Sequence, residues 1–156
     1  METVKHPIPK ERLAHMIGVA EYMYTNAARY NLDSKKMYVL GLLHDIGYIS
    51  GNKSGHEEYG AELLKNCFPG SESNLLEIIK MHDITPQEYI ESNNCKKDDI
   101  PKELLLLLEA DMMVDLSGEV VGFDTRLEAI KNHYGEYSNP YKICHETIEW
   151  LKENSC

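Results

Sequence analysis

The most constraining feature of this sequence is an apolar stretch that ends in a histidine followed directly by an aspartate. It reads Leu40-Gly41-Leu42-Leu43-His44-Asp45-Ile46-Gly47-Tyr48. A helix that is apolar on nearly every side is buried, and a buried carboxylate without a partner costs free energy. No basic side chain in the stretch can neutralise Asp45. A metal ion bound by His44 and Asp45 would do so; the alternative is a polar pair beyond a helix end, facing water.

Composition narrows the classes of partner. The 156 residues suit one domain spanning residues 1–156, and 42% hydrophobic with 27% charged residues is typical of a globular protein. The formal net charge of −10 would repel a phosphate backbone, so we expect no nucleic-acid binding. A small phosphorylated substrate stays compatible if a metal and nearby basic groups override the global charge locally.

The cysteines and the N-terminal segment indicate a cytoplasmic protein. No two cysteines have CxxC spacing, which predicts reduced thiols at Cys67, Cys95, Cys144 and Cys156. Residues 1–10 are polar and lack the apolar core of a signal peptide. No segment approaches the ~20 apolar residues of a membrane span, so we expect no membrane contact.

Apolar residues recur with the helical period, which predicts an all-α bundle. The first helix follows Pro9, and its predicted apolar stripe is Leu13, Met16, Ile17, Ala20, Tyr24 and Ala27. The second helix contains the opening stretch. Asp33 or Ser34 can cap its start, and Gly47 and Gly51 are expected to end it.

Two polar segments separate the next helices. Residues 48–55 are glycine-rich and predicted to be mobile, and Ser54 and Glu57 have the capping-box spacing that predicts a helix from His56. A fourth helix places His82 among aliphatic residues near its end. Residues 83–99 follow, with a capping box that predicts a short helix over 86–91. This segment could cover a site beside His82; a plain surface excursion is the alternative.

The C-terminal part continues the helical pattern. A helix after Pro101 carries a leucine run and Asp111, and Asp115 is expected on the same side one turn later. A further helix bears Arg126, and Asn139 with the following proline predicts the start of the last one.

Six metal-ligating side chains occur on apolar faces or at the ends of five different helices. They are His15, His44, Asp45, His56, His82 and Asp111. Each one alone is more often a hydrogen-bonded core or helix-end residue. Together, several imidazoles around shared carboxylates suit divalent iron, manganese, cobalt or zinc, and a carboxylate flanked by histidines is what a two-metal site requires. We interpret His6, His133 and His145 as surface residues.

These residues carry a family resemblance. The order and surroundings of His15, His44-Asp45 and Asp111 resemble the pattern of the HD-domain superfamily of metal-dependent phosphohydrolases, over about Pro9 to Leu151. The matching segments are Arg12-Leu13-Ala14-His15, Leu42-Leu43-His44-Asp45-Ile46-Gly47 and Glu109-Ala110-Asp111. The resemblance implies an HD-domain helical bundle in which His15, His44, Asp45 and Asp111 hold a first metal. His56 and His82 look like the extra ligands of dinuclear members, such as the bacterial symmetrical diadenosine tetraphosphate hydrolases. Asp45 would then bridge two ions.

The resemblance implies attack on phosphorus by a metal-activated hydroxide, and we expect a nucleotide-like substrate. We expect Asp45 to act in catalysis together with a cation that receives the phosphate, for which Lys53, Arg126 and Arg12 are candidates; ordinary surface charges are the alternative. Asp83 and Asp115 are candidates for orienting the metal ligands.

The sequence also departs from these relatives. Many dinuclear members have a lysine where this chain has Tyr48, which puts one phosphate-binding cation in question. Three alternative functions stay open: a symmetrical bis(5'-nucleosyl)-tetraphosphatase, an HD-type diiron oxygenase and a non-catalytic nucleotide-binding regulator. Assembly as a homodimer stays open as well.

Overall fold

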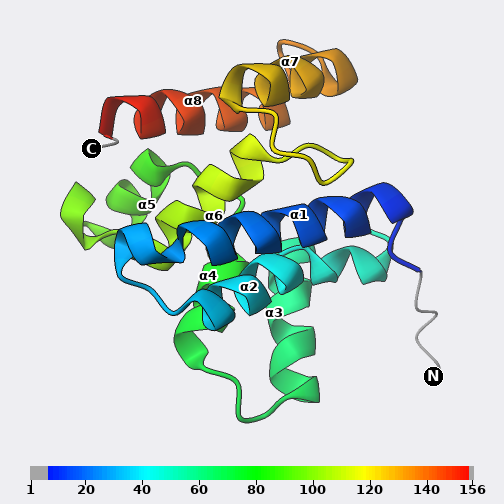
Figure 1. Cartoon of the computed structure of the whole chain (residues 1–156), viewed down its shortest axis with the longest axis vertical. Coiled ribbons are helices and arrows are strands. Elements are labelled where there is room, and N and C mark those ends of the chain that lie inside the picture. The colour runs from blue at the N-terminus through cyan, green and yellow to red at the C-terminus, as the bar shows by residue number, and fades with distance from the viewer. Residues whose placement is uncertain (1–6, 155–156) are drawn as a thin grey trace.

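The computed structural model describes residues 7–154, and helices make up nearly all of its regular structure (Figure 1). One isolated antiparallel bridge joins Val114 and Val120. The prediction of an all-α fold is confirmed. In chain order the elements are α1 Lys10–Asn26, η1 Ala27–Tyr30, α2 Ser34–Leu43, η2 Ile46–Ser50, α3 His56–Cys67, α4 Ser73–Met81, α5 Pro86–Asn93, η3 Lys97–Asp99, α6 Lys102–Met113, α7 Phe123–Tyr134 and α8 Asn139–Asn154, where η marks a 3₁₀-helix.

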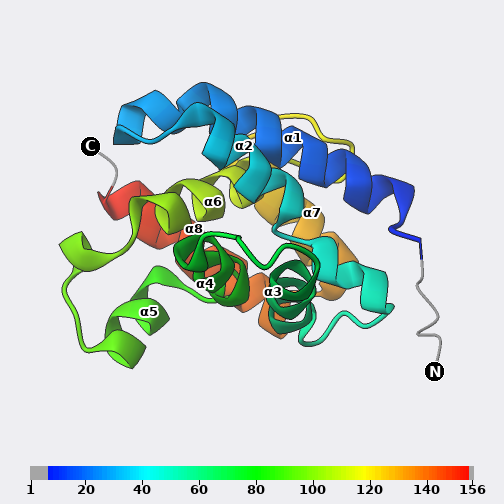
Figure 2. The same cartoon turned by 90° about the horizontal axis from the view of Figure 1, so that it is seen from below.

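Helix α6 is the central element. It packs against α1 and α2 on one side and against α7 and α8 on the other, while α3 and α4 pair with each other below (Figures 1 and 2). Its leucine run is buried almost completely, at Leu104, Leu106, Leu107 and Leu108. Burial on nearly every side explains why this helix shows little amphipathic pattern in the sequence. Among the described helices, none is both long and apolar enough to cross a membrane.

Three predicted helix starts are confirmed, two of them with the expected side-chain cap and the third, at His56, without it. The Asp33 carboxylate accepts a hydrogen bond from the Lys36 backbone N–H at 2.8 Å, and the capping box at Thr85 is formed in full. Helix α5 then runs to Asn93, two residues beyond the predicted end. The capping box predicted from Ser54 is not formed, because Gly55 in the left-handed conformation occupies the N-cap position of α3 and Ser54 lies one residue too early.

The connection after His44 contains a 3₁₀-helix that was not predicted. Helix α2 ends at Leu43, before the predicted end at Gly47 and Gly51, and residues 46–50 form the 3₁₀-helix η2. Gly47 lies inside η2: a Cβ atom there would lie 1.6 Å from the His56 carbonyl oxygen, and Gly60 packs against the Gly47 backbone. Glycine is required at position 47 because η2 touches the backbone of α3. This close approach brings the His44-Asp45 pair next to His56.

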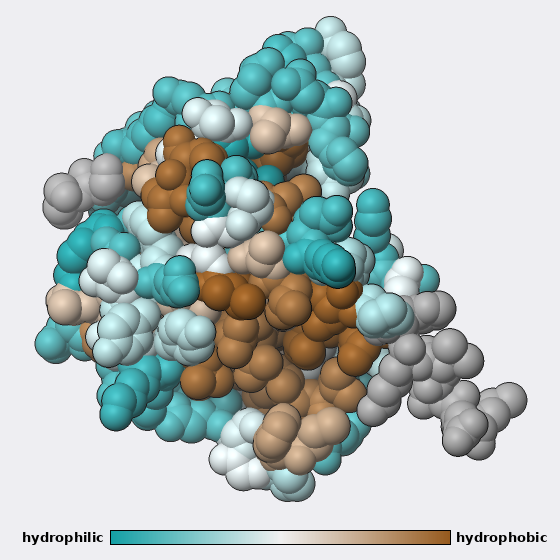
Figure 3. Space-filling model, turned by 45° about the vertical axis from the view of Figure 1, so that its right-hand side comes forward, coloured by the Kyte–Doolittle hydropathy of each residue, from teal (hydrophilic) through white to brown (hydrophobic). Residues whose placement is uncertain are grey.

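Part of the predicted stripe of α1 lies on the surface. Met16, Ala20 and Ala27 are buried, whereas Leu13, Ile17 and Tyr24 are 44%, 38% and 50% exposed. Helix α1 packs against α2 and α6 and leaves its remaining side open to solvent. Hydrophobic residues gather visibly on one side of the molecule (Figure 3).

A buried carboxylate on α6 is fully satisfied by groups from the first helix and the turn after it. Glu109 accepts hydrogen bonds from the Tyr22 hydroxyl at 2.6 Å, from Arg29 Nη1 at 2.8 Å and from the Tyr30 hydroxyl at 2.9 Å. Burial would raise the pKa of Glu109, but these donors outweigh burial and lower it. This hydrogen-bond network links α6 to α1 and η1 at Glu109, two residues before Asp111.

Candidate metal centre

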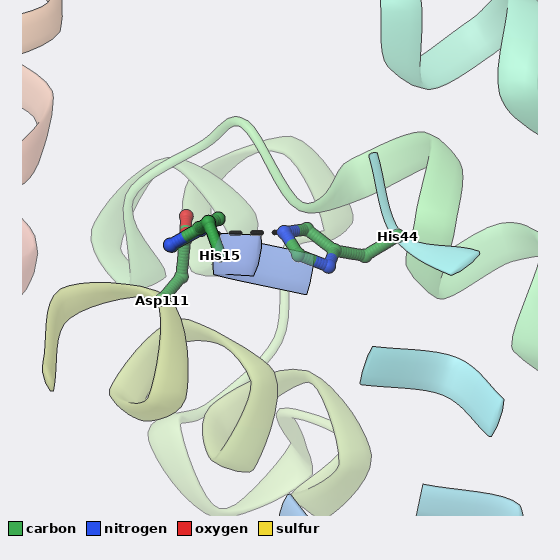
Figure 4. Close-up of side chains that lie close together, drawn as sticks. All are labelled: His15, His44 and Asp111. Carbon is green, nitrogen blue, oxygen red and sulfur yellow. Dashed lines mark hydrogen bonds and ion pairs between the residues drawn. The ribbon is translucent and has the colours of Figure 1, made fainter. Parts of the chain in front are cut away.

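The fold brings all six candidate ligands to one place, although they come from distant parts of the chain. His15 lies on α1, Asp111 on α6, and His56 is the first residue of α3. His44 and His82 directly follow the last residues of α2 and α4. The four histidines and Asp45 are buried, and the Asp111 side chain is 22% exposed. Figure 4 shows His15, His44 and Asp111 converging from three helices.

One group of donor atoms lies between α1, α2 and α6. The Nε2 atom of His15 is 2.7 Å from Oδ1 of Asp111. The Nε2 atom of His44 is 3.8 Å from the same oxygen and 3.3 Å from Oδ2 of Asp45. His15, His44 and Asp111 together could hold a metal ion.

A second group lies on the other side of Asp45. Its Oδ1 atom is 3.1 Å from Nε2 of His56 and 3.2 Å from Nε2 of His82. His44, Asp45 and His82 form another group that could hold a metal ion. The two oxygens of Asp45 therefore face different histidines, the arrangement that a bridging carboxylate needs.

All four imidazoles are oriented in the same way. Each Nδ1 atom faces a backbone carbonyl oxygen, at 3.1, 2.6, 2.8 and 2.5 Å, namely those of Asp115 for His15, Gly41 for His44, Lys53 for His56 and Ile79 for His82. Because a carbonyl only accepts, Nδ1 carries the proton in each ring and leaves the Nε2 lone pair facing the centre. Backbone hydrogen bonds of this kind fix the tautomer of metal-binding histidines.

The donor set fits a divalent metal. The Nε2 atom of His44 is buried and has no hydrogen-bond partner within residues 7–154. The Nε2 atoms of His56 and His82 lie 3.2 Å apart, and two lone pairs at that separation repel unless a proton or a metal ion lies between them. Imidazole nitrogens with carboxylate oxygens suit manganese, iron, cobalt or zinc better than calcium or magnesium.

Electrostatics couples the carboxylates and the imidazoles. Burial would raise the pKa of Asp45, but the imidazoles of His44, His56 and His82 outweigh it and hold that pKa well below its usual range. Burial lowers the pKa of His44, but the Asp45 carboxylate outweighs it and raises the pKa to about 8. Metal binding has to displace protons from such rings, which makes metal affinity dependent on pH.

Comparison with known proteins agrees with this geometry. A family model for the HD domain matches residues 12–121. The chain belongs to the HD-domain family. The HD-domain match contains all six candidate ligands and ends before α7. An uncharacterized protein of Methanocaldococcus jannaschii is 29% identical over 149 residues, covering 85% of this chain and 86% of that protein. The search of solved structures found no match.

A cavity of about 390 Å³ borders the candidate metal ligands of this HD-domain protein. Asp45, His56, His82 and Asp111 all line it. Helices α7 and α8 also contribute to its wall, through Ala129, Ile130, His133, Tyr134, Pro140 and Cys144. Burial raises the pKa of the Cys144 thiol to about 12, so this cysteine is protonated and unreactive at neutral pH.

The candidate cations differ in where they lie. Arg12 and Arg126 line the cavity, whereas Lys53 does not. Arg12 Nη1 donates to Oδ2 of Asp45 at 2.9 Å, and Arg126 Nε donates to the Asp111 carbonyl oxygen at 3.3 Å. Lys53 is exposed and takes part through its backbone carbonyl, which accepts the His56 hydrogen bond. The prediction that the Lys53 side chain acts in catalysis gains no support, because η2 and the turn after it carry that side chain to the surface.

The proposed orienting residues also need correction. Helix α6 ends at Met113, so Asp115 lies in a turn and not one helical turn beyond Asp111. Its carboxylate accepts hydrogen bonds from the backbone N–H groups of Ser117 and Glu119, and its carbonyl oxygen orients His15. Asp83 is exposed at the cavity wall, and the Nδ1 atom of the neighbouring His82 faces the Ile79 carbonyl oxygen instead.

Segment 83–99 does not cover the site. Of its residues only Asp83 lines the cavity, and α5 packs against α8 instead. The wall formed by α7 and α8 is the part that sequence reasoning missed. Arg126, Ala129, Ile130 and His133 stand at positions i, i+3, i+4 and i+7, which lie on one side of a helix, and that pattern was the available signal. His133 is exposed, as predicted, yet it lies on this wall; His145 is exposed, and His6 falls outside the described residues.

Proposed function

We propose that this HD-domain protein is a metal-dependent phosphohydrolase that cleaves a phosphate ester or anhydride of a nucleotide-like substrate. The observation that carries the proposal is one cavity that is lined both by candidate metal ligands and by two arginines. His15, His44, Asp45 and Asp111 would hold one ion, and His56 and His82 would hold a second that shares Asp45.

Charge within the cavity supports a site that needs its metals before it can bind phosphate. Among the described residues, four carboxylates, those of Asp45, Asp83, Asp111 and Asp115, oppose the two guanidinium groups of Arg12 and Arg126. The excess of two negative charges would repel a phosphate. One divalent ion would only neutralise that excess, whereas two would make the cavity positive.

The protein's own groups would then orient the metal ligands and bind the phosphate. When bound, divalent ions lower the pKa of a coordinated water to near neutrality and stabilise charge on the phosphoryl oxygens. The backbone carbonyls behind each Nδ1 keep the four Nε2 atoms aimed at the centre, and Asp45 joins the two halves of the site. Arg12 and Arg126 can donate charge-assisted hydrogen bonds to phosphate oxygens.

The size of the cavity favours a substrate with one nucleoside-sized group. Ligand sites span roughly 300–1,000 Å³, and about 390 Å³ lies near the lower end of that range. The ring of Tyr134, on the cavity wall, provides apolar surface for a planar organic group. We therefore propose a mononucleotide-type substrate ahead of a symmetrical dinucleoside tetraphosphate, which has two nucleoside groups to place.

The test is a substrate screen on protein reconstituted with Mn²⁺, Co²⁺ or, without oxygen, Fe²⁺. We expect phosphate release from a nucleoside phosphate and its loss in Asp45→Asn, with His145→Ala, an exposed histidine away from the cavity, as the matched control. Oxygen uptake recorded in the same assay would point to oxygenase chemistry. Protein that binds metal fully and releases no phosphate from nucleotides, dinucleoside polyphosphates or phosphomonoesters would refute the proposal.

A further inference from the structure

Arg12 and Tyr48 form a stacked pair on the wall of the cavity. The guanidinium carbon of Arg12 lies 4.3 Å from the centroid of the Tyr48 ring, close enough for cation–π attraction. Both residues line the cavity, and the Arg12 side chain is only 18% exposed. Partial removal from water strengthens an attraction of this kind relative to an open surface.

Tyr48 is itself held firmly, so its ring can serve as a platform. It lies in η2, where its backbone N–H donates to the Asp45 carbonyl oxygen at 3.1 Å. Its ring centroid is 4.3 Å from that of His56, with an angle of 42° between the ring planes. The ring therefore contacts both the Arg12 guanidinium and a metal-ligating imidazole.

The guanidinium of Arg12 uses only part of its hydrogen-bonding capacity. Nη1 donates to Oδ2 of Asp45, and the part of the chain that the structure describes offers its other N–H groups no acceptor. A guanidinium carries five N–H donors in a rigid fork that matches the oxygens of a phosphate. Arg12 thus has donors to spare in a cavity where a phosphate would lie beside Asp45.

We propose that Tyr48 is a positioning residue whose ring holds the Arg12 guanidinium beside Asp45, where Arg12 binds a phosphoryl oxygen of the substrate. The inference rests on the proposed function, since it assigns the phosphate-binding group of that same site. The inference makes Arg12, on α1, the cation that binds phosphate, and it makes the position of Arg12 depend on the Tyr48 ring of η2. The ring face and not the phenol hydroxyl is the part of Tyr48 that acts.

The test uses full-length protein reconstituted with Mn²⁺ and inorganic phosphate as the probe, measured by isothermal titration calorimetry. We expect Tyr48→Leu to weaken phosphate binding about 3- to 30-fold, the range that corresponds to loss of a cation–π contact. Tyr48→Phe should bind phosphate within about twofold of the original protein, because it keeps the ring. Tyr24→Leu, at an exposed tyrosine of α1 away from the cavity, is the matched control.

A double-mutant cycle separates positioning of Arg12 from a general structural role. Adding Tyr48→Leu to Arg12→Gln should cause no further loss of phosphate binding, because the ring then has no guanidinium to hold. Additive losses, or a loss in Tyr48→Phe equal to that in Tyr48→Leu, would overturn the inference. So would a fall in the manganese content of Tyr48→Leu, which would show that the ring acts through His56. If Tyr48→Leu binds phosphate as well as the original protein does, the inference is overturned and the proposed function is not. If the original protein itself binds no phosphate, both are overturned.

Discussion

Removing the His44 side chain should abolish most of the stabilisation that metal confers on the protein. His44 belongs to both groups of three residues that could hold an ion. Its Nε2 atom is buried without a hydrogen-bond partner among the described residues and lies 3.3 Å from Oδ2 of Asp45, a position from which it could coordinate a metal ion. His44→Ala therefore tests the centre at the residue that both halves share.

The size of the effect follows from linkage. An ion present at 100 times its dissociation constant stabilises a protein by about 2.7 kcal/mol, which raises the Tm of a domain of this size by about 5–11 °C. If losing one ligand weakens binding about 100-fold, the same metal concentration stabilises the variant by about 0.4 kcal/mol, or less than about 2 °C. The alanine also leaves a void and frees the Gly41 carbonyl, which lowers the starting stability by about 1–3 kcal/mol.

The informative quantity is the change in Tm between excess EDTA and excess Mn²⁺, measured by calorimetry, since it is independent of the lower starting stability. Metal content by inductively coupled plasma spectrometry should fall in parallel. His145→Ala removes an exposed histidine of α8 that stacks on Tyr141, and it should keep the full shift. A His44→Ala protein that retains both the shift and its metal would refute the role assigned to this residue.

Three further predictions concern pH and packing. In EDTA, the free energy of unfolding should fall as pH rises from about 6.5 through about 8. The reason is that folding raises the pKa of His44 to about 8, so the stabilisation by its protonated ring is complete below the unfolded-state pKa of 6.5 and is lost as the ring deprotonates. Metal affinity should rise over the same interval, because metal competes with that proton. Calorimetry and metal titration across pH 6–9 check both signs, and parallel trends would contradict the reasoning. Glu109→Gln should lower the free energy of unfolding by about 1–3 kcal/mol in urea denaturation at pH 7. In the unmutated protein that contribution should decline as pH falls below about 4.5, because the pKa of Glu109 is lowered on folding; an equally stable variant would refute it. Gly47→Ala should cost about 1–3 kcal/mol or more and reduce bound metal, because a Cβ would strike the His56 carbonyl. Gly70→Ala, where a Cβ meets nothing within 4 Å, is the control, and equal stability of the two variants would count against the packing argument.

The sequence by itself was sufficient for the fold class and for the set of candidate ligands. Helical periodicity, the Asp33 cap and the capping box at Thr85 are local properties, so they can be read from neighbouring residues. His44 and Asp45 were recognisable because a polar pair interrupts a run of apolar residues, and the cost of burying a charge does not depend on knowing the fold.

Tertiary structure alone decided how these groups are used. The orientation of each imidazole depends on a backbone carbonyl, and for His15 that carbonyl belongs to Asp115, 100 residues away. Arg12 lines the cavity and Lys53 does not, and this difference likewise depends on how η2 packs on α3. Such contacts are set by long-range packing between helices, for which local sequence carries no signal. For the same reason the surface position of Leu13 and the cavity wall from α7 and α8 emerged only once the helices were placed together.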